Sequence, residues 1–177
     1  MLPLDTVLTF FATALMLALA PGPDIIFVLT QSALYGMRAG VATTLGLISG
    51  LCFHTTIVAV GVAGIFMTSP LAFTLLTIVG AAYLLYLAWL SFRAGASMAH
   101  LQESRFLGYW GLYRRGVIMN ITNPKVTLFF LAFLPQFCAP ERGSVALQVM
   151  ELGLLFMLAA FLVFTAVSAL GGRLAHW

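Results

Sequence analysis

Residues 39 to 92 form an uninterrupted stretch of 54 residues that contains no Asp, Glu, Lys or Arg. A membrane-spanning helix needs about 20 apolar residues, so this stretch is too long for one span and suits two. The whole chain follows the same trend, with 7% charged and 62% hydrophobic residues against the roughly 25% charged residues of a soluble domain. This composition excludes a water-soluble globule, a disordered chain and a coiled coil. It predicts an all-α fold, a polytopic transmembrane helix bundle.

Apolar stretches of suitable length divide residues 1–177 into five predicted spans within a single transmembrane domain. The two spans of the uncharged stretch are separated near residues 67–70, and the polar stretch at residues 93–115 is predicted to be a loop. The first span is expected to be retained, because the extreme N-terminus carries Asp5 and lacks the Lys or Arg of a signal peptide. The predicted spans cover about residues 4–34, 41–66, 70–92, 116–137 and 145–170.

The arginines are distributed unevenly over the predicted loops. The loops that follow the first, third and fifth spans share one side of the membrane and carry six arginines, whereas the other side carries Arg142. Because Lys and Arg are enriched in cytoplasmic loops, we predict that the N-terminus is outside and that residues 93–115 are cytoplasmic. The basic residues are scattered, so no nucleic-acid partner is expected. The six arginines are Arg38, Arg93, Arg105, Arg114, Arg115 and Arg173.

Two charged residues, Asp24 and Lys125, fall well inside predicted spans, where a charge is costly and commonly functional. Counted from the nearest cytoplasmic arginines at about 1.5 Å per helical residue, the two lie at similar depth in the bilayer. We therefore expect them to neutralise each other, either directly or through a bound ligand. The alternative is a static ion pair that holds the first and fourth spans together.

The sequence Pro21-Gly22-Pro23-Asp24 interrupts the first predicted span. Each proline lacks an N–H and disfavours a helical residue before it, while Gly22 tolerates unusual backbone angles. The span is therefore predicted to consist of two half-helices that meet inside the membrane. Asp24 is a candidate cap of the second half-helix. Unwound backbone at membrane depth is tolerated where it is buried in protein or lines a cavity.

A second break is predicted in the fourth span, where Pro124 follows Asn123 and precedes Lys125. The proline frees a carbonyl one turn earlier, and the nearby Asn120 adds a further donor and acceptor. Pro135 is expected to bend or end the same span. Two polar helices broken by proline, one in each half of the chain, are the pattern expected of a transporter site.

Other polar residues have simpler interpretations. His54 on the second span is a candidate coupling residue, although a hydrogen-bonded packing histidine is the more frequent finding. Cys52 and Cys138 lie far apart in sequence and form no CxxC pair, so neither a metal site nor a disulfide framework is predicted, and no cofactor is expected. No serine–histidine or paired-carboxylate pattern in the sequence indicates an enzyme.

Four features occur along the chain in a fixed order: Pro21-Gly22-Pro23-Asp24, then Gly46, Gly50 and His54 on one span, then residues 80–87, then Asn123-Pro124-Lys125 leading to residues 133–137. In this combination the chain resembles the LysE/RhtB family over about residues 4–170. Members of that family are bacterial inner-membrane exporters of amino acids such as lysine, homoserine, threonine and leucine. Members continue into a sixth span, which is absent here, so a truncated chain, a shortened homologue and a subunit completed by a partner all stay open.

The resemblance implies efflux of a small solute in exchange for protons, from a multi-pass subunit in the inner membrane for which a homodimer is expected. It assigns the site to both broken spans. Independently of the resemblance, an amino acid offers a carboxylate, which suits helix N–H groups and Lys125, and an ammonium group, which suits Asp24 and freed carbonyls. The implied site residues are Pro21, Gly22, Pro23, Asp24, Asn120, Asn123, Pro124 and Lys125.

Two interpretations from other classes are left open. A structural or assembly subunit of a larger membrane complex would tolerate apolar residues at both breaks. A membrane thiol–disulfide carrier would need Cys52 and Cys138 to meet across spans.

Overall fold

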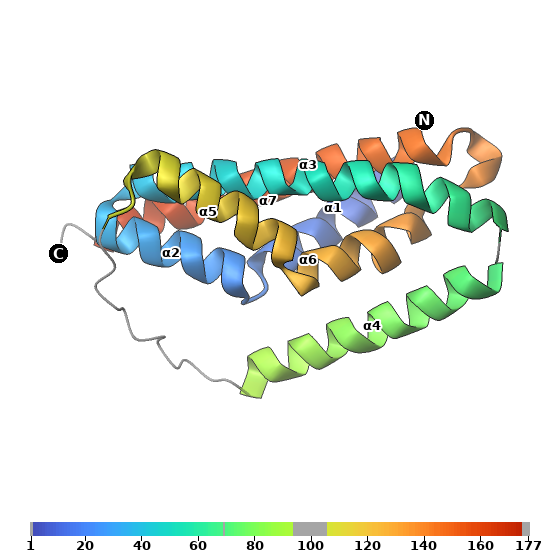
Figure 1. Cartoon of the computed structure of the whole chain (residues 1–177), viewed down its shortest axis with the longest axis horizontal. Helices are drawn as coiled ribbons and strands as arrows, with labels where there is room; N and C mark the ends of the chain where they lie inside the picture. The colour runs from blue at the N-terminus through green and yellow to red at the C-terminus, as the bar shows by residue number, and fades with distance from the viewer. Residues whose placement is uncertain (1, 69, 94–105, 175–177) are drawn as a thin grey trace.

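The computed structural model describes residues 2–68, 70–93 and 106–174, and this part of the chain is helical with no strand (Figure 1). The all-α prediction is therefore confirmed. One π-helical turn and two short 3₁₀ turns follow the sixth helix: η1 Phe129–Phe133, η2 Leu134–Phe137 and η3 Pro140–Arg142. The seven α-helices are α1 Leu4–Leu19, α2 Pro23–Tyr35, α3 Met37–Thr68, α4 Pro70–Arg93, α5 Gly108–Thr122, α6 Pro124–Leu128 and α7 Val145–Leu174.

In the described chain, two helices are by themselves long and apolar enough to cross a membrane, α3 over Met37–Gly61 and α7 over Val145–Arg173. Two bent pairs of helices reach that length together. One pair is α1 with α2, bent by 58°, and the other is α5 with Pro124–Phe137, bent by 49°. A shorter apolar helix covers Thr74–Leu90 within α4. The fold is thus a polytopic helix bundle, and both predicted breaks are present.

The fourth predicted span differs from the structure at its start. The polar stretch at residues 93–115 was expected to be a loop, but α5 already begins at Gly108, and residues 94–105, including Arg105, lie outside the described part. The first turns of α5 pack on α3, where the Tyr113 hydroxyl donates a hydrogen bond to Ser49 Oγ at 2.9 Å. Leu112 is fully buried. Hydropathy missed this helical extension because two consecutive arginines follow these packing residues.

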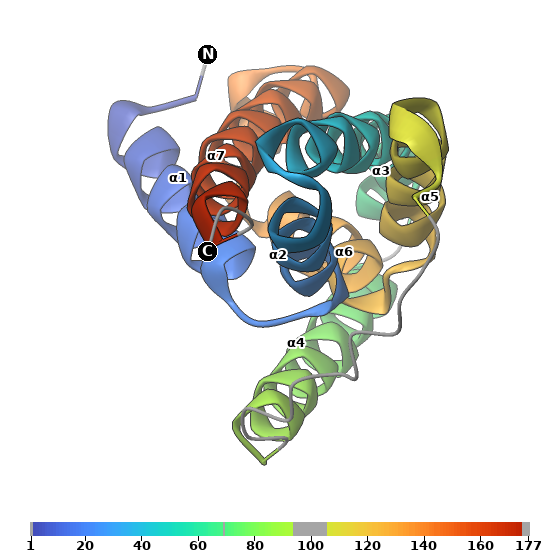
Figure 2. The same ribbon diagram turned by 90° about the vertical axis from the view of Figure 1, so that its left-hand side faces the viewer.

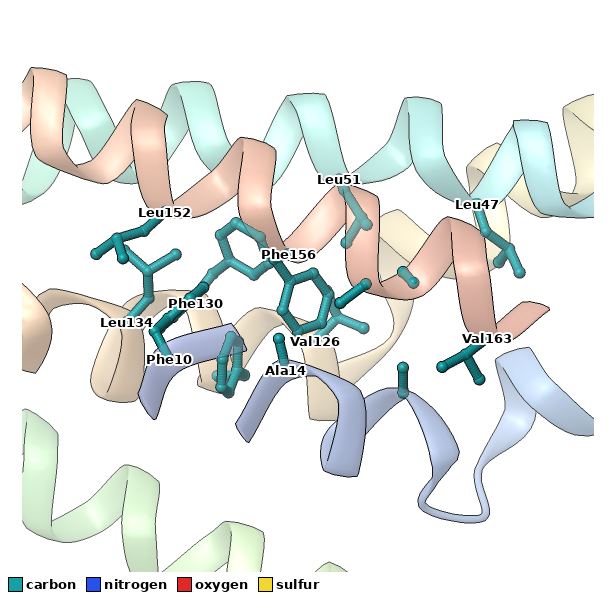
Figure 3. Packing of buried hydrophobic residues seen from close by; sticks show 14 of the residues in the cluster. Phe10, Ala14, Leu47, Leu51, Val126, Phe130, Leu134, Leu152, Phe156 and Val163 are labelled. Atoms are coloured by element: carbon teal, nitrogen blue, oxygen red, sulfur yellow. The ribbon is translucent and has the colours of Figure 1, made fainter. Parts of the chain in front are cut away.

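Aromatic side chains fill the core between α1, η1 and α7 (Figure 3). The ring of Phe129 lies 6.0 Å from that of Phe10 and 4.9 Å from that of Phe156, and the ring of Phe130 lies 5.3 Å from Phe156. All four residues are buried. Phe129 and Phe130 therefore pack inside the bundle.

Glycines allow α3 to approach α5 closely at the level of the second break. A Cβ atom on Gly46 would overlap the backbone of Tyr113, and one on Gly50 would overlap the side chain of Asn120. The GxxxG spacing therefore serves packing within the chain. It also sets the position of Asn120 against α3.

Helix α4 diverges from the other helices, as both Figure 1 and Figure 2 show. It meets the bundle mainly at η1, where Gly80 lies directly against Ala132. Further along, Leu85 and Trp89 are exposed. Most of the apolar surface of α4 therefore faces away from the rest of the chain.

The arginines of several predicted cytoplasmic loops gather at one end of the bundle. Figure 1 shows the corner between α2 and α3, the start of α5 and the end of α7 at the same end. Tyr35 and Phe106 hold two of these segments together with ring centroids 5.0 Å apart. Helices α3, α5 and α7 carry Arg38, Arg114, Arg115 and Arg173 there. The turn η3, which contains Arg142, directly precedes the start of α7 at the opposite end.

Candidate functional site

The first break lies between Leu19, where α1 ends, and Pro23, where α2 begins. Ala20 and Gly22 have extended backbones, and the last carbonyls of α1 therefore lack helical N–H partners. Lys125 from the second break supplies the missing donors: its Nζ donates to Leu17 O at 2.8 Å and to Ala20 O at 2.9 Å. The ammonium group thus completes the C-terminal end of α1.

The backbone conformation of Gly22 differs from the one predicted from the sequence. Its φ of −178° and ψ of 174° describe extended backbone that other residues also adopt, so the break does not need the conformational freedom of glycine. A Cβ atom there would meet the Lys125 side chain at 3.6 Å, an ordinary contact distance. Gly22 therefore provides some space beside Lys125 rather than an unusual backbone angle.

Asp24 lies in the first turn of α2 and is 7% exposed. Its Oδ2 accepts a hydrogen bond from Asn120 Nδ2 at 3.1 Å. Helix α2 has no side-chain cap, so the prediction that Asp24 caps this helix is wrong. Within the described chain Asp24 and Lys125 also form no direct ion pair, and Lys125 Nζ donates to carbonyls of α1 instead. A static ion pair between the two spans is therefore not observed.

The second break is shorter. Asn123 is the one residue between α5 and α6, and its Oδ1 accepts a hydrogen bond from the backbone N–H of Lys125 at 3.0 Å. Pro124 occupies the first helical position, where its missing N–H is harmless. Asn123 thus caps the helix that follows and orients Lys125 toward the first break.

A small space, which we call the inner cavity, lies between the two breaks. Its volume of about 30 Å³ suffices for about two water molecules or one ammonium-sized group. Asp24 Oδ1 and Asn120 Oδ1 are both buried and have no hydrogen-bond partner in the structure. Two unpaired buried acceptors at one site are unusual, because such groups normally find a donor. The polar residues that line the cavity are Asp24, Asn120, Asn123 and Lys125.

His54 lies behind the inner cavity and does not line it. Its Nε2 is 3.1 Å from Asn120 O, and its ring lies 5.7 Å from the ring of Phe130. The imidazole is therefore one residue removed from Asp24, with Asn120 between them. This arrangement supports the positioning of Asn120, and it keeps His54 out of direct reach of a solute in the cavity.

A larger space, the α4 cleft, opens between α4 and the two breaks. Its volume is about 600 Å³, within the usual range of small-molecule sites, and its walls are mainly apolar. Pro21, Pro23 and Pro124 line the cleft from the breaks. The cleft and the inner cavity share five lining residues: Leu17, Ala20, Gly22, Asn123 and Lys125.

The structure therefore brings together all the predicted site residues except His54, in two adjoining spaces. Sequence reasoning missed the α1 carbonyls of Leu17 and Ala20, because a backbone acceptor carries no residue signature. It also missed the α4 residues Leu84 and Ala88. An apolar residue that lines a cleft cannot be distinguished in sequence from one that faces lipid.

The two cysteines lie away from this site. Cys52 on α3 has its Sγ 3.8 Å from Met157 Sδ, and Cys138 follows η2. Both are free thiols, and neither lines the inner cavity or the α4 cleft. The described residues contain no group of three His, Cys, Asp or Glu side chains that could hold a metal ion.

Two broken helices that face each other across a cavity lined by Asp24 and Lys125, within an apolar bundle, define a membrane protein of the transporter class. The chain matches the LysE type translocator family over residues 15–177 and belongs to that family. No solved structure matches the chain.

Several curated proteins are similar over nearly the whole chain. A homoserine/homoserine lactone efflux protein of Salmonella typhimurium is 36% identical over 170 residues, which cover 95% of this chain and 81% of that protein. An uncharacterized membrane protein of Vibrio cholerae is 32% identical, with 96% and 82% covered. An uncharacterized membrane protein of Bacillus subtilis is 31% identical, with 91% and 80% covered.

Proposed function

We propose that this protein exports amino acids or close derivatives from the cytoplasm in exchange for protons, by alternating access around the two breaks. Membership of the LysE type translocator family and the efflux proteins among its relatives support the direction and the solute class. The observation that carries the proposal is the pair of unpaired acceptors, Asp24 Oδ1 and Asn120 Oδ1, beside the inner cavity. A ligand that brings N–H donors there would satisfy both.

The substrate ammonium group fits this position. It carries three N–H donors and a positive charge, and Asp24 offers one free carboxylate oxygen. Charge-assisted hydrogen bonds of this kind are about twice as strong as neutral ones. The amide oxygen of Asn120 adds a second acceptor from the other break, so the ammonium group would bind both broken helices at once.

The substrate carboxylate is assigned to Lys125. Its Nζ carries three N–H donors, of which two bind the carbonyls of Leu17 and Ala20. The third donor is available to a carboxylate. The N-terminus of α2 lines the same space and adds a partial positive charge. The zwitterionic part of an amino acid would thus find one partner for each charge.

Proton exchange follows from competition for one oxygen. A proton on Asp24 removes the negative charge that attracts the substrate ammonium group, so the proton and the substrate compete for this carboxylate. Release of the ammonium group therefore favours protonation of Asp24, and loss of that proton restores the binding site. Alternating occupancy of a single carboxylate is sufficient to couple the two fluxes.

The arginine-rich end of the bundle is proposed to face the cytoplasm of a bacterial inner membrane, with the N-terminus outside. Four arginines of α3, α5 and α7 lie at that end, and Arg142 lies at the other. With α4 as a further span, the chain crosses the bilayer five times. Export then carries substrate from the arginine-rich end toward the end that holds Arg142.

The test is efflux of preloaded homoserine from proteoliposomes. We expect Asp24→Asn and Lys125→Ala each to reduce the rate by about 100-fold or more, because each removes a charge that pairs with the substrate. Glu151→Gln on the exposed face of α7 and Arg142→Ala in the opposite loop are matched controls that should keep wild-type rates. Normal efflux by both site variants would refute the assignment.

Proton coupling has a separate readout. In the wild type, a vesicle interior more acidic than the exterior should change the rate of homoserine efflux in one direction. An interior more alkaline than the exterior should change it in the other direction. Asp24→Asn should retain at most slow exchange that ignores the pH difference. Export that is insensitive to the pH difference in the wild type would refute the exchange with protons while leaving export itself in place.

A further inference from the structure

The α4 cleft is much larger than the inner cavity that it adjoins. The inner cavity, at about 30 Å³, has room for an ammonium group and little else, whereas the cleft has a volume of about 600 Å³. We propose that the cleft-facing side of α4 forms the side-chain compartment of the site and selects uncharged side chains over charged ones. This inference rests on the proposed function, because it concerns the same substrate.

The position of the compartment follows from the shared walls. Gly22, Asn123 and Lys125 line both spaces, so a solute that reaches Asp24 with its ammonium group has its remaining atoms at this junction. The inner cavity cannot enclose a side chain of several carbon atoms. The side chain must therefore extend into the cleft, toward α4.

The chemistry of the compartment favours apolar groups. Helix α4 contributes Leu84, Leu87, Ala88 and Leu90, and the breaks contribute three proline rings. Removing an apolar side chain from water into such surroundings is favourable in proportion to the apolar area buried. A neutral aliphatic side chain would gain this contribution in full.

Charged side chains find no partner in the compartment. Within the described chain its lining contains no carboxylate, and Lys125 is its one charged side chain. A second ammonium group, as in ornithine, would be desolvated without a counter-ion and repelled by Lys125. A second carboxylate, as in glutamate, would compete for the single free donor of Lys125. Ornithine is therefore disfavoured because it lacks a counter-ion, and glutamate because its two carboxylates share one donor.

The experiment is counterflow into proteoliposomes loaded with homoserine, with norleucine, ornithine and glutamate as competitors. For the wild type we expect norleucine to compete at least about tenfold better than ornithine or glutamate, the scale set by unpaired buried groups. Equal competition by all three would overturn the inference and leave the proposed export of amino acids intact. Absence of any counterflow would overturn both.

Two variants of Ala88 test the location of the compartment. Ala88→Asp supplies the missing carboxylate and should raise competition by ornithine about tenfold, while competition by norleucine falls. Ala88→Phe reduces the volume of the cleft, and competition by norleucine should weaken while competition by alanine is kept. Transport of alanine also shows that this variant is folded. Ala82 is exposed on α4 and does not line the cleft, so Ala82→Asp and Ala82→Phe are the matched controls. If the Ala88 and Ala82 variants show the same competition by each amino acid, the substrate side chain does not bind in the cleft.

Discussion

The two breaks find hydrogen-bond partners for their free backbone groups in different ways. Both interrupt an apolar span with a proline at the first position of the second half-helix. The first bends the chain by 58° and receives its hydrogen-bond donors from Lys125, a residue more than a hundred positions away. The second bends it by 49° and is capped by its own Asn123. The hydrogen bonds of the first break therefore depend on a residue distant in sequence, whereas those of the second break are formed within the break itself.

This difference assigns the breaks distinct parts in the transport cycle. The first break is held in its present shape by two hydrogen bonds from Lys125, the side chain that is also proposed to bind the substrate carboxylate. The second break keeps its cap whatever Lys125 binds. We therefore expect the first break to rearrange when substrate binds, and the second to serve as the fixed support.

The largest effect is expected for Lys125→Met, which removes the ammonium group and keeps an apolar chain of similar length. Leu17 O and Ala20 O lose their donors, and two part-buried acceptors left unpaired lower the free energy of unfolding by roughly 2–6 kcal/mol. Unfolding by denaturant in detergent micelles measures this, with Arg142→Met as the exposed control. Unchanged stability would mean that the first break does not depend on Lys125.

Asn120→Leu should rank second, because this residue connects the two breaks. It is 1% exposed, and its loss leaves Asp24 Oδ2 without a donor, which costs roughly 1–3 kcal/mol. Homoserine efflux should fall with it. Thr122→Val, on the same helix but exposed and bonded to Ile118 O, is the control and should behave as the wild type. If both variants lose equal stability, Asn120 has no special role.

Asn123→Ala should have a smaller effect, confined to the second break. Loss of a helix cap costs about 1 kcal/mol, and Asn123→Asp, which retains an acceptor oxygen, should recover most of it. The same unfolding measurement applies. A loss as large as that of Lys125→Met would show that the second break is no more independent than the first.

The smallest effect is expected for Gly22→Ala. The extended backbone accepts alanine and the added methyl group makes an ordinary contact with Lys125, so stability should change by no more than about 0.5 kcal/mol. Efflux measured in parallel decides what the change means. Normal stability with strongly reduced efflux would show that the first break passes through a conformation that glycine alone adopts, which would sharpen the distinction between the breaks.

Much of the fold could be predicted because lipid imposes simple rules on a chain. The uncharged stretch, the proline breaks and the two buried charges all carry direct physical signals, and both breaks occur where predicted. The start of α5 at Gly108 was missed, because its packing through Tyr113 depends on where α3 lies. The expected cap at Asp24 is absent for the same kind of reason, since its Oδ2 accepts from Asn120 on a helix that is remote in sequence.

The amino-acid sequence by itself determined that this chain resides in a membrane, that two helices are broken, and that polar groups occur at the breaks. These follow from composition and from the missing N–H of proline. The tertiary structure decided which donor serves which acceptor. Lys125 binds carbonyls of α1 rather than Asp24, two oxygens are left unpaired, and α4 adds an apolar compartment. Such choices depend on distances between segments remote in sequence, which the pattern of one chain does not encode.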